Sequence, residues 1–328
     1  MKVAILSDDR PGHFNQSKGV VNLISEDIDL EYTVFSSKLK LHFLRSPLKL
    51  YQKFLAKNLN KTNAKKIIKI FQYVDLEDFD LLISSGGNTI YHSAALSNLF
   101  KIKNIHIGSI KDINLANFEA HITTDAVINS PNNIVTDLAP TRFKPDVKEK
   151  SKSNKSLFLL GGNGAGYLYD ESDWKNLING IKDLAETTNI SPIIVTSRRT
   201  NKIHESLIFD EINMISDVAS VWFHKTGENA DLNSIFKMVD AIYVSEDSAT
   251  MTTEAISSGL PVFTLYPKSF NPSEKFNQQL KKYEDMKLIK RMSFKSELST
   301  ISTSNNSNNL VLEIRKKLKE QILFKIQQ

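Results

Sequence analysis

The sequence predicts an α/β protein made of two domains, each built on a parallel β-sheet. Short apolar runs recur along the chain, and each ends in small or polar residues before a helical-looking segment; the runs are 3–6, 81–83, 105–107, 157–160, 193–195, 241–244 and 262–265. This alternation is typical of parallel sheets, whose strands are buried on both faces. The 328 residues exceed the usual domain size of about 100 to 200 residues, which indicates two Rossmann-like domains.

The composition is that of an ordinary globular protein without a disulfide framework. Cysteine is absent, which excludes disulfides, thiolate nucleophiles and Cys-ligated zinc and allows a reducing compartment. The N-terminus offers about five apolar residues before charge begins, too few for a signal peptide or a membrane span. We therefore expect a cytoplasmic protein. The net charge of +5 favours anionic partners.

The domain boundary is expected between Thr141 and Ser156, where the chain is polar and rich in lysine. We expect an N-terminal domain over residues 1–145 and a C-terminal domain over residues 156–298. A Ser/Asn-rich stretch at 299–309 follows. Apolar residues at helical spacing within residues 310–328 then predict a closing helix that packs on one of the domains.

Residues 38–69 carry the charge excess, because their charged side chains are all cationic. Lysines occupy every fourth position from Lys49 to Lys69 and would form one drifting stripe on a helix. The segment is either a solvated helix face or a surface that docks on anionic lipid headgroups. Nucleic acid is a weaker candidate partner, because no helix-turn-helix, RNP or zinc-finger pattern accompanies the charge.

The loop after the first expected strand gathers an unusual set of chemical groups. Its polar residues are Asp8, Asp9, Arg10, His13, Asn15 and Gln16. Histidine titrates near neutral pH, so His13 could take a proton from a hydroxyl group. The alternative is that Asp8 or Asp9 only caps the following helix and that His13 is a surface residue.

A second loop, after the expected strand 81–83, contains Gly86, Gly87, Asn88 and Thr89. Glycines before a hydroxyl side chain at a helix start present free backbone N–H groups, which suit an anion or a sugar hydroxyl. A plain tight turn would have the same composition, and both interpretations stay open.

In the second half, two loops offer groups for a phosphate. Gly161, Gly162 and Asn163 follow a strand, but Tyr167 occupies the last glycine position of a dinucleotide fingerprint, so this loop fits a phosphate or a sugar better than NAD(P). Ser197, Arg198 and Arg199 follow the next expected strand. Adjacent arginines suit a diphosphate, although a surface pair is the alternative.

The segment around Ser248 is the most specific of all. Ser248 has the pattern of a helix N-cap, and the N–H groups after it would bind phosphate. Glu254 lies further along the same helix, where its carboxylate could accept both hydroxyls of a ribose. The neighbouring candidates for ligand binding are Glu246, Asp247, Thr250 and Met251. The alternative is a capping serine beside a solvated glutamate.

These segments resemble the family named for a mitochondrial fission protein, which includes bacterial outer-core glycosyltransferases. Residues 7–16 match the Ser-Asp-Gly-Arg-x-Gly-His-x-Asn-Gln pattern of that family except at Asp9. Residues 196–200 are similar to its Thr-Ser-Arg-Arg-Thr segment, and residues 245–251 to its Thr-x-Asp-Ser-x-Ser-Met segment. Where the family has Gly-Arg-Arg-Thr, residues 86–89 read Gly-Gly-Asn-Thr, which removes two positive charges.

The resemblance implies a GT-B-like fold, with two facing Rossmann-like domains and a cleft between them. It implies a glycosyltransferase that moves a sugar from a nucleotide-sugar donor to a saccharide or lipid-linked acceptor, in cell-envelope polysaccharide or lipopolysaccharide core synthesis. We expect His13 as general base, oriented or replaced by Asp8, while Arg10 meets an anionic group. We expect no metal and no tightly bound cofactor.

Three other functions remain open. A nucleotide-sugar epimerase or hydrolase would share the donor site and need no acceptor. A non-catalytic membrane adaptor would use the basic segment alone. An NADP enzyme ranks last, because the fingerprint spacing is wrong. If the basic segment binds lipid, the protein is peripheral on the inner face of the cytoplasmic membrane.

Overall fold

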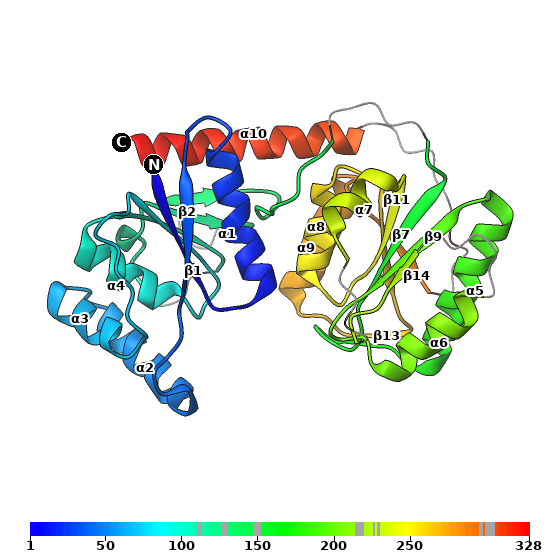
Figure 1. Ribbon diagram of the computed structural model, residues 1–328, viewed down its shortest axis with the longest axis horizontal. Coiled ribbons are helices and arrows are strands. Elements are labelled where there is room, and N and C mark those ends of the chain that lie inside the picture. The colour runs from blue at the N-terminus through cyan, green and yellow to red at the C-terminus, as the bar shows by residue number, and fades with distance from the viewer. Residues whose placement is uncertain are drawn as a thin grey trace. The chain divides into compact units, whose positions relative to one another are not determined.

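The computed structural model describes residues 1–109, 113–125, 130–146, 152–213, 220–225, 227, 230–294, 298 and 306–328. The chain divides into two compact units (Figure 1). Unit 1 comprises Met1–Arg142 and Glu313–Gln328, and unit 2 comprises Phe143–Leu312. Residues 147–151 of the expected boundary stretch and residues 299–305 of the Ser/Asn-rich stretch lie outside the described residues.

Within the described residues, unit 1 contains a parallel sheet of six strands in the order β2-β1-β3-β4-β5-β6. The strands are β1 (Lys2–Ser7), β2 (Glu31–Ser36), β3 (Leu81–Ser85), β4 (Lys103–Ile107), β5 (Ala120–Thr123) and β6 (Asn133–Val135). Successive side chains of β1 alternate between two cores: Val3 and Ile5 belong to one cluster, Ala4 and Leu6 to another. Both faces of the sheet are therefore covered, as its apolar strands require.

The helices of unit 1 are α1 (Pro11–Ile24), α2 (Arg45–Ala56), α3 (Lys61–Lys69), α4 (Ile90–Phe100) and the greater part of α10 (Asn306–Gln327), with short 3-10 turns at His42–Leu44 and Leu115–Asn117. Leu318 and Ile322 of α10 pack into the same core as Val3 and Ile5. The closing helix thus completes this core, although its first residues belong to unit 2.

The basic segment does not form one helix, and the prediction of a single lysine stripe is wrong. Helix α2 ends at Ala56, and α3 begins at Lys61. The side chain of Asn60 accepts a hydrogen bond from the backbone N–H of Asn63 and so caps a new helix. Asparagine favours this position because its short side chain replaces a missing helical acceptor. The lysines before and after Asn60 therefore lie on separate helices.

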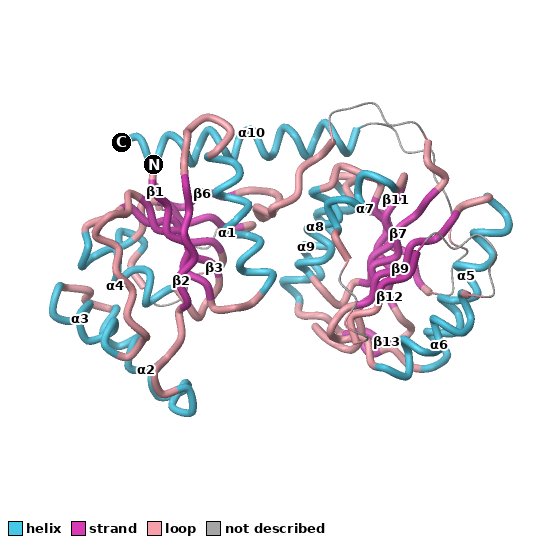
Figure 2. The backbone as a smooth tube through the Cα atoms, in the orientation of Figure 1, coloured by secondary structure: helices cyan, strands magenta, loops and turns pink. Residues whose placement is uncertain are grey.

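Unit 2 contains a second parallel sheet, in the order β10-β9-β7-β11-β12-β14, and a two-stranded antiparallel pair (Figure 2). The strands are β7 (Lys155–Leu160), β8 (Tyr167–Leu168), β9 (Ser191–Thr196), β10 (Ser220–Trp222), β11 (Ala241–Ser245), β12 (Val262–Tyr266), β13 (Ser269–Phe270) and β14 (Lys290–Ser293). The helices are α5 (Glu171–Thr188), α6 (Lys202–Ile212), α7 (Leu232–Met238), α8 (Ala249–Ser257) and α9 (Glu274–Asp285). Helices α5 and α6 cover one face of the sheet, and α7, α8 and α9 lie on the other (Figure 1).

The predicted α/β class with parallel sheets is confirmed, and every expected apolar run is a strand. Five strands of the two sheets, β2, β5, β6, β10 and β14, have no counterpart among the expected runs. Strand β2 is an edge strand that is largely exposed, so it lacks a continuous apolar run. Strands β6 and β10 contain three residues each, which is too short to give a periodic signal.

Each sheet has one point where the strand order reverses. In unit 1 this point lies between β1 and β3, and in unit 2 between β7 and β11. The order in unit 2 is that of a Rossmann dinucleotide-binding sheet, and ligands of such sheets bind at the carboxyl ends of the strands beside the reversal. The loops singled out by the sequence follow these four strands and, in unit 2, β9 as well.

Candidate functional site

In unit 1, Asp8 and His13 form a pair at the end of β1. The Nδ1 atom of His13 lies 3.0 Å from Asp8 Oδ1 and 3.1 Å from Oδ2. Arg10 is the N-cap residue of α1, which has no side-chain cap, so the interpretation of Asp8 or Asp9 as a helix cap is wrong. The Asp8 side chain is 4% exposed and the His13 side chain 28% exposed.

The loop after β3 completes this site from the neighbouring strand. Asn88 donates a hydrogen bond from Nδ2 to Asp8 Oδ2 at 2.7 Å. Gly86 leaves room for the imidazole: it has a φ of +82°, and a Cβ there would lie 2.2 Å from Cε1 of His13. The Ser85 hydroxyl donates to Gln16 Oε1 at 2.5 Å and ties α1 to β3. The two loops therefore hold His13 in one place.

The ionisation of Asp8 fixes which nitrogen of His13 can act as a base. Burial opposes ionisation of this carboxyl, but the hydrogen bonds from His13 and Asn88 outweigh it and hold the pKa of Asp8 below its usual value. An ionised carboxylate only accepts hydrogen bonds, so Nδ1 must carry the proton. Neutral His13 then has its lone pair on Nε2, which is the arrangement of a general base.

The other residues predicted for these loops have different surroundings. Thr89 is buried, and its hydroxyl donates to the carbonyl oxygens of Ser85 and Gly86, so it stabilises the turn. Gly87 is exposed, with open space where a Cβ would stand. Asn15 is partly buried in α1. Arg10 is half exposed, with Nε 3.7 Å from Asp8 Oδ2.

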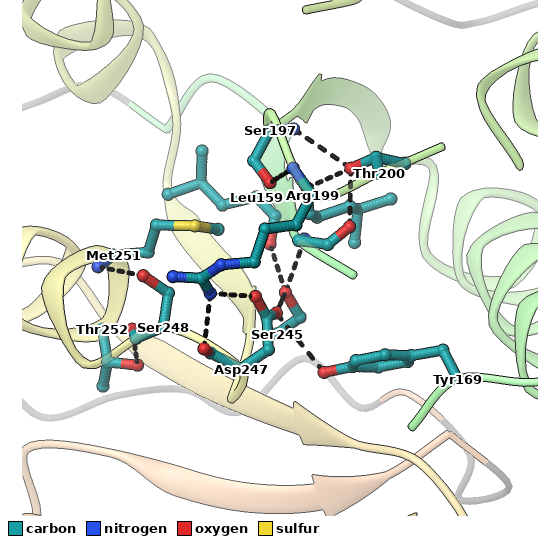
Figure 3. A network of polar contacts seen from close by, with 12 residues as sticks. Leu159, Tyr169, Ser197, Arg199, Thr200, Ser245, Asp247, Ser248, Met251 and Thr252 are labelled. Atoms are coloured by element: carbon teal, nitrogen blue, oxygen red, sulfur yellow. Dashed lines mark hydrogen bonds and ion pairs between the residues drawn. The ribbon is translucent and has the colours of Figure 1, made fainter. Parts of the chain in front are cut away.

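In unit 2, the loops after β7, β9 and β11 meet in one network of polar contacts (Figure 3). Arg199 Nη1 donates to both the backbone oxygen and Oδ2 of Asp247, each at 2.5 Å. The Thr200 hydroxyl contacts the carbonyl oxygens of Leu160 and Gly161 at 3.0 and 2.6 Å. Ser197 accepts a hydrogen bond from the backbone N–H of Arg199 at 3.1 Å.

The two acidic residues of this region are occupied within the protein. Asp247 is fully buried and paired with Arg199. Glu246 is also fully buried; Arg291 binds both of its oxygens at 2.8 Å, and Thr264 donates to it at 2.7 Å. These carboxylates would therefore influence a ligand through the arginines that bind them. Direct contact of Glu246 or Asp247 with a ligand stays a prediction.

The glycines of the loop after β7 are explained by packing inside the unit. A Cβ on Gly161 would lie 2.0 Å from Asp247 Oδ1, and one on Gly162 would lie 2.3 Å from the backbone oxygen of Arg199. The Gly161 N–H donates to the Ser245 hydroxyl at 2.7 Å, and Asn163 accepts from the Tyr169 N–H at 2.8 Å. Ligand binding by these three residues stays a prediction.

The N-terminus of α8 is the part of unit 2 that best suits an anion. Ser248 is its N-cap, as predicted, and accepts a hydrogen bond from the Met251 N–H at 3.4 Å. The first N–H groups of a helix have no helical acceptor and attract negative charge. Thr250 and Met251 are partly exposed. Glu254 lies on the same helix and is 6% exposed.

Arg198 differs from its neighbour Arg199 in its exposure. Its side chain is exposed, whereas Arg199 is partly buried by its pairing with Asp247. Arg198 therefore supplies a cationic group to solvent beside the network, and Arg199 stabilises the loop.

Three residues that the sequence analysis did not select also belong to these sites. Arg45 donates from Nη2 to Asn88 Oδ1 at 2.8 Å, and Gln52 lines the same cavity as Asp8. Arg291 neutralises Glu246 from β14. Nothing in the local pattern separates these residues from ordinary surface positions, because the groups that they face are remote in sequence.

Two parallel sheets, each with its polar residues at a reversal of strand order, define an α/β protein with two Rossmann-like domains. The family described as "Mitochondrial fission ELM1" matches residues 11–317, and the chain belongs to this family. The resemblance found in the sequence is confirmed.

Solved structures share the fold at low sequence identity. The UDP-GlcNAc 2-epimerase of Methanocaldococcus jannaschii superposes with a TM-score of 0.51 and 12% identity, over 95% of this chain and 92% of that one. A Listeria monocytogenes protein described as a UDP-N-acetylglucosamine 2-epimerase gives a TM-score of 0.52 and 11% identity, over 98% and 90% of the two chains. These likenesses show the fold.

A curated relative matches a shorter part of the chain. "Uncharacterized protein RP120" of Rickettsia prowazekii (strain Madrid E) is 29% identical over 118 residues, which is 34% of this chain and 32% of that protein. The chain thus matches about a third of the length of this relative.

Proposed function

We propose that the protein is a glycosyltransferase that moves a sugar from a nucleotide-sugar donor to an acceptor hydroxyl. The observation that carries the proposal is the Asp8–His13 pair at the strand reversal of unit 1. Its buried carboxylate leaves Nε2 of His13 as the basic nitrogen, and transfer to a hydroxyl requires a group that removes its proton. The acceptor hydroxyl gives its proton to Nε2 as its oxygen forms the new bond to the sugar.

The donor belongs to unit 2 in this proposal. The diphosphate binds at the N-terminus of α8 and beside the exposed Arg198, and Glu254 accepts hydrogen bonds from the ribose hydroxyls. As the bond from the sugar to the diphosphate breaks, negative charge develops on the leaving oxygen. Fixed N–H groups and a guanidinium stabilise such charge without a metal ion, so we expect turnover to persist when EDTA is added.

Melting temperature tests the donor site independently of turnover. A nucleotide that binds only the folded protein must raise its melting temperature. We expect a rise with one class of nucleoside diphosphate that is lost in Glu254→Ala and kept in Glu186→Ala, a control at an exposed glutamate of α5. A rise with none of the nucleotides, or an equal rise in both variants, would contradict this donor site.

Turnover tests the role of His13 and separates the rival functions. With donor alone, an epimerase or hydrolase consumes the nucleotide sugar, whereas a transferase releases nucleoside diphosphate only when an acceptor is added. We expect His13→Ala to keep the melting shift with donor and to lose transfer. Transfer at the wild-type rate in His13→Ala would overturn the proposal. A protein in which neither Glu254 nor His13 matters would be the non-catalytic adaptor.

We further propose that the acceptor is a lipid-linked saccharide of the cell envelope, as in lipopolysaccharide core synthesis, at the inner face of the cytoplasmic membrane. Large apolar side chains stand exposed on and before α2: Phe43 is 80% exposed, Leu50 69% and Phe54 72%. Lys49 and Lys53 lie on the same helix. Among the described residues, none of the helices is long and apolar enough to span a bilayer. Apolar residues flanked by lysines suit shallow binding to an anionic surface.

Vesicle sedimentation tests this surface. We expect the protein to sediment with phosphatidylglycerol vesicles and to stay in solution with phosphatidylcholine vesicles. The double variant Leu50→Ser/Phe54→Ser should lose this binding, because the buried apolar area drives insertion. The control Ile203→Ser changes a residue of α6 that is 77% exposed. Equal sedimentation of all three proteins would exclude α2 as the docking element.

A further inference from the structure

A cavity of about 290 Å³ opens beside the Asp8–His13 pair in unit 1. It is bounded by the loop after β1, the residues after β2, the inner side of α2 and the loop after β3. Its size lies near the lower end of small-molecule sites, which span about 300 to 1,000 Å³. The cavity therefore has room for a small charged group beside Asp8, the partner of the proposed base His13.

The lining of this cavity has a positive charge excess. Four cationic residues and two carboxylates face it: Arg10, Lys38, Arg45 and Lys49 with Asp8 and Asp9. Both carboxylates already have partners, because Asp8 binds His13 and Asn88, while Asp9 lies 3.0 Å from the Lys38 amine.

The charges of Arg45 and Lys49 are the ones left uncompensated. Arg45 contacts the neutral amide oxygen of Asn88 at 2.8 Å. Neither Arg45 nor Lys49 has a carboxylate within ion-pair distance in the part of the chain that the structure describes. They lie four residues apart on α2, so they share one side of the helix.

Gln52 adds a neutral hydrogen-bonding group to the lining of the cavity. Its side chain is 3% exposed and lines the cavity, yet it makes no hydrogen bond to the described residues. Its amide faces the cavity, so its donor and acceptor groups are available to a group that enters there. An oxygen-rich group inside the cavity would accept hydrogen bonds from Nε2 of Gln52 and from the two cations together.

We propose that this cavity binds a phosphate group, held by Arg45, Lys49 and Gln52. Resting on the proposed function, we assign that phosphate to the acceptor, so the substrate carries a phosphate near the hydroxyl that His13 deprotonates. Two sources share this chemistry: a soluble phosphate ester, such as a sugar phosphate, and the phosphate of a lipid headgroup. A neutral oligosaccharide offers no partner for the two charges.

Titration of the full-length protein with glycerol 1-phosphate tests the site without needing the true substrate. We expect saturable binding at constant ionic strength, weakened about tenfold or more in Arg45→Gln/Lys49→Gln, because two charge-assisted hydrogen bonds are lost. Gln52→Glu should weaken it as well by repulsion, and circular dichroism checks that each variant is folded. The control Lys65→Gln/Lys66→Gln removes the same charge from α3.

The outcomes separate the two sources and the two proposals. Binding of soluble glycerol 1-phosphate, lost only in the cavity variants, supports a soluble phosphate ester. Binding to phosphatidylglycerol vesicles but not to glycerol 1-phosphate supports a lipid headgroup if it is lost in Gln52→Glu as well as in Arg45→Gln/Lys49→Gln, because Gln52 is buried and lines the cavity. Unchanged binding in the cavity variants, or an equal loss in the α3 control, overturns the site. The nucleotide-dependent melting shift reports on unit 2, so its absence would contradict the donor site and leave the phosphate result standing.

Discussion

At the scale of single residues, the sites depend on side chains that fix one another. Asp8 accepts from His13 and Asn88, and Asn88 in turn accepts from Arg45. The sequence identified Asp8, His13 and Asn88 because they lie in the loops or the helix start that follow apolar strands. It could not identify Arg45, since the contact joins positions 43 residues apart. It also proposed Thr89 as a ligand contact, whereas the hydroxyl of Thr89 is used within its own turn.

Replacing Asp8 by Asn should reduce transfer strongly. The amide can present its NH₂ group to Nδ1, which favours the tautomer whose Nε2 carries the proton and cannot act as a base. We expect turnover to fall by roughly 100-fold or more, the usual size of general-base effects. Asp78→Asn is the matched control, because Asp78 is an exposed carboxylate of unit 1 that does not line the cavity beside Asp8. Equal rates in both variants would remove Asp8 from the mechanism.

A buried histidine should make unit 1 sensitive to acid. His92 is fully buried, stacks on Phe71 and shares a hydrogen bond with Ser37; burial lowers its pKa to about 3. In the unfolded chain the pKa of His92 is near 6.5. Between about pH 3 and pH 6.5 the unfolded chain therefore binds one more proton at His92 than the folded chain does. The contribution of His92 to stability is therefore present above about pH 6.5 and falls by about 1.4 kcal/mol per pH unit below it. His106, whose pKa burial also lowers to about 3, adds a second slope of the same sign.

Urea unfolding at a series of pH values from 7 to 4.5 measures this dependence. His92→Leu should be less stable than the wild type at pH 7. Its free energy of unfolding should fall less steeply below about pH 6.5, because one fewer proton is taken up on unfolding. His224→Leu, at an exposed histidine of unit 2, should keep the wild-type slope. An unchanged slope in His92→Leu would show that another group governs the acid sensitivity.

At the scale of elements, the parallel strands bring the polar loops together. The sequence predicted their apolar runs and polar exits, and adjacent strands place the exits side by side. It did not predict that the glycines after β7 are required by Asp247 and Arg199, because a glycine needed for internal packing has the same local pattern as one that approaches a ligand. The sequence predicted one helix for the basic segment, because its lysines keep their spacing of four residues past Asn60, where α3 begins with its N-cap.

Gly86 and Gly87 provide a direct test of the loop after β3. In Gly86→Ala the new methyl group overlaps the His13 ring, and the backbone has a φ of +82°, which is strained for alanine. We expect the variant to lose about 1 kcal/mol or more of folding stability and most of its transfer activity. Gly87→Ala has open space around its Cβ and should match the wild type in melting temperature. Similar effects of both changes would mean that Gly86 does not set the position of His13.

At the scale of the whole molecule, α10 connects the end of the chain to the core of the first unit. Leu318 and Ile322 are 3% and 0% exposed within the cluster that contains Val3 and Ile5. The sequence predicted a closing helix from its spacing, but not which domain it completes, because either sheet offers an apolar face.

Truncating one of these contacts should destabilise unit 1. We expect Leu318→Ala to lower the free energy of unfolding by about 2 to 5 kcal/mol, as for other large-to-small changes in a core. Phe324→Ala, at a residue of α10 that is 62% exposed, should change it by less than about 1 kcal/mol. Chemical denaturation followed by circular dichroism measures both values. Equal values would contradict the packing of α10 on this core.

The route of α10 also sets an order of events during synthesis. Residues 1–142 of unit 1 are made before unit 2, yet the core of unit 1 includes Leu318 and Ile322, which emerge after all of unit 2. At about 5 to 20 residues per second, the nascent first unit waits on the order of 10 s or more with that part of its core uncovered. Unit 2 is translated without such an interruption, so the second domain to be made is the first that can finish folding.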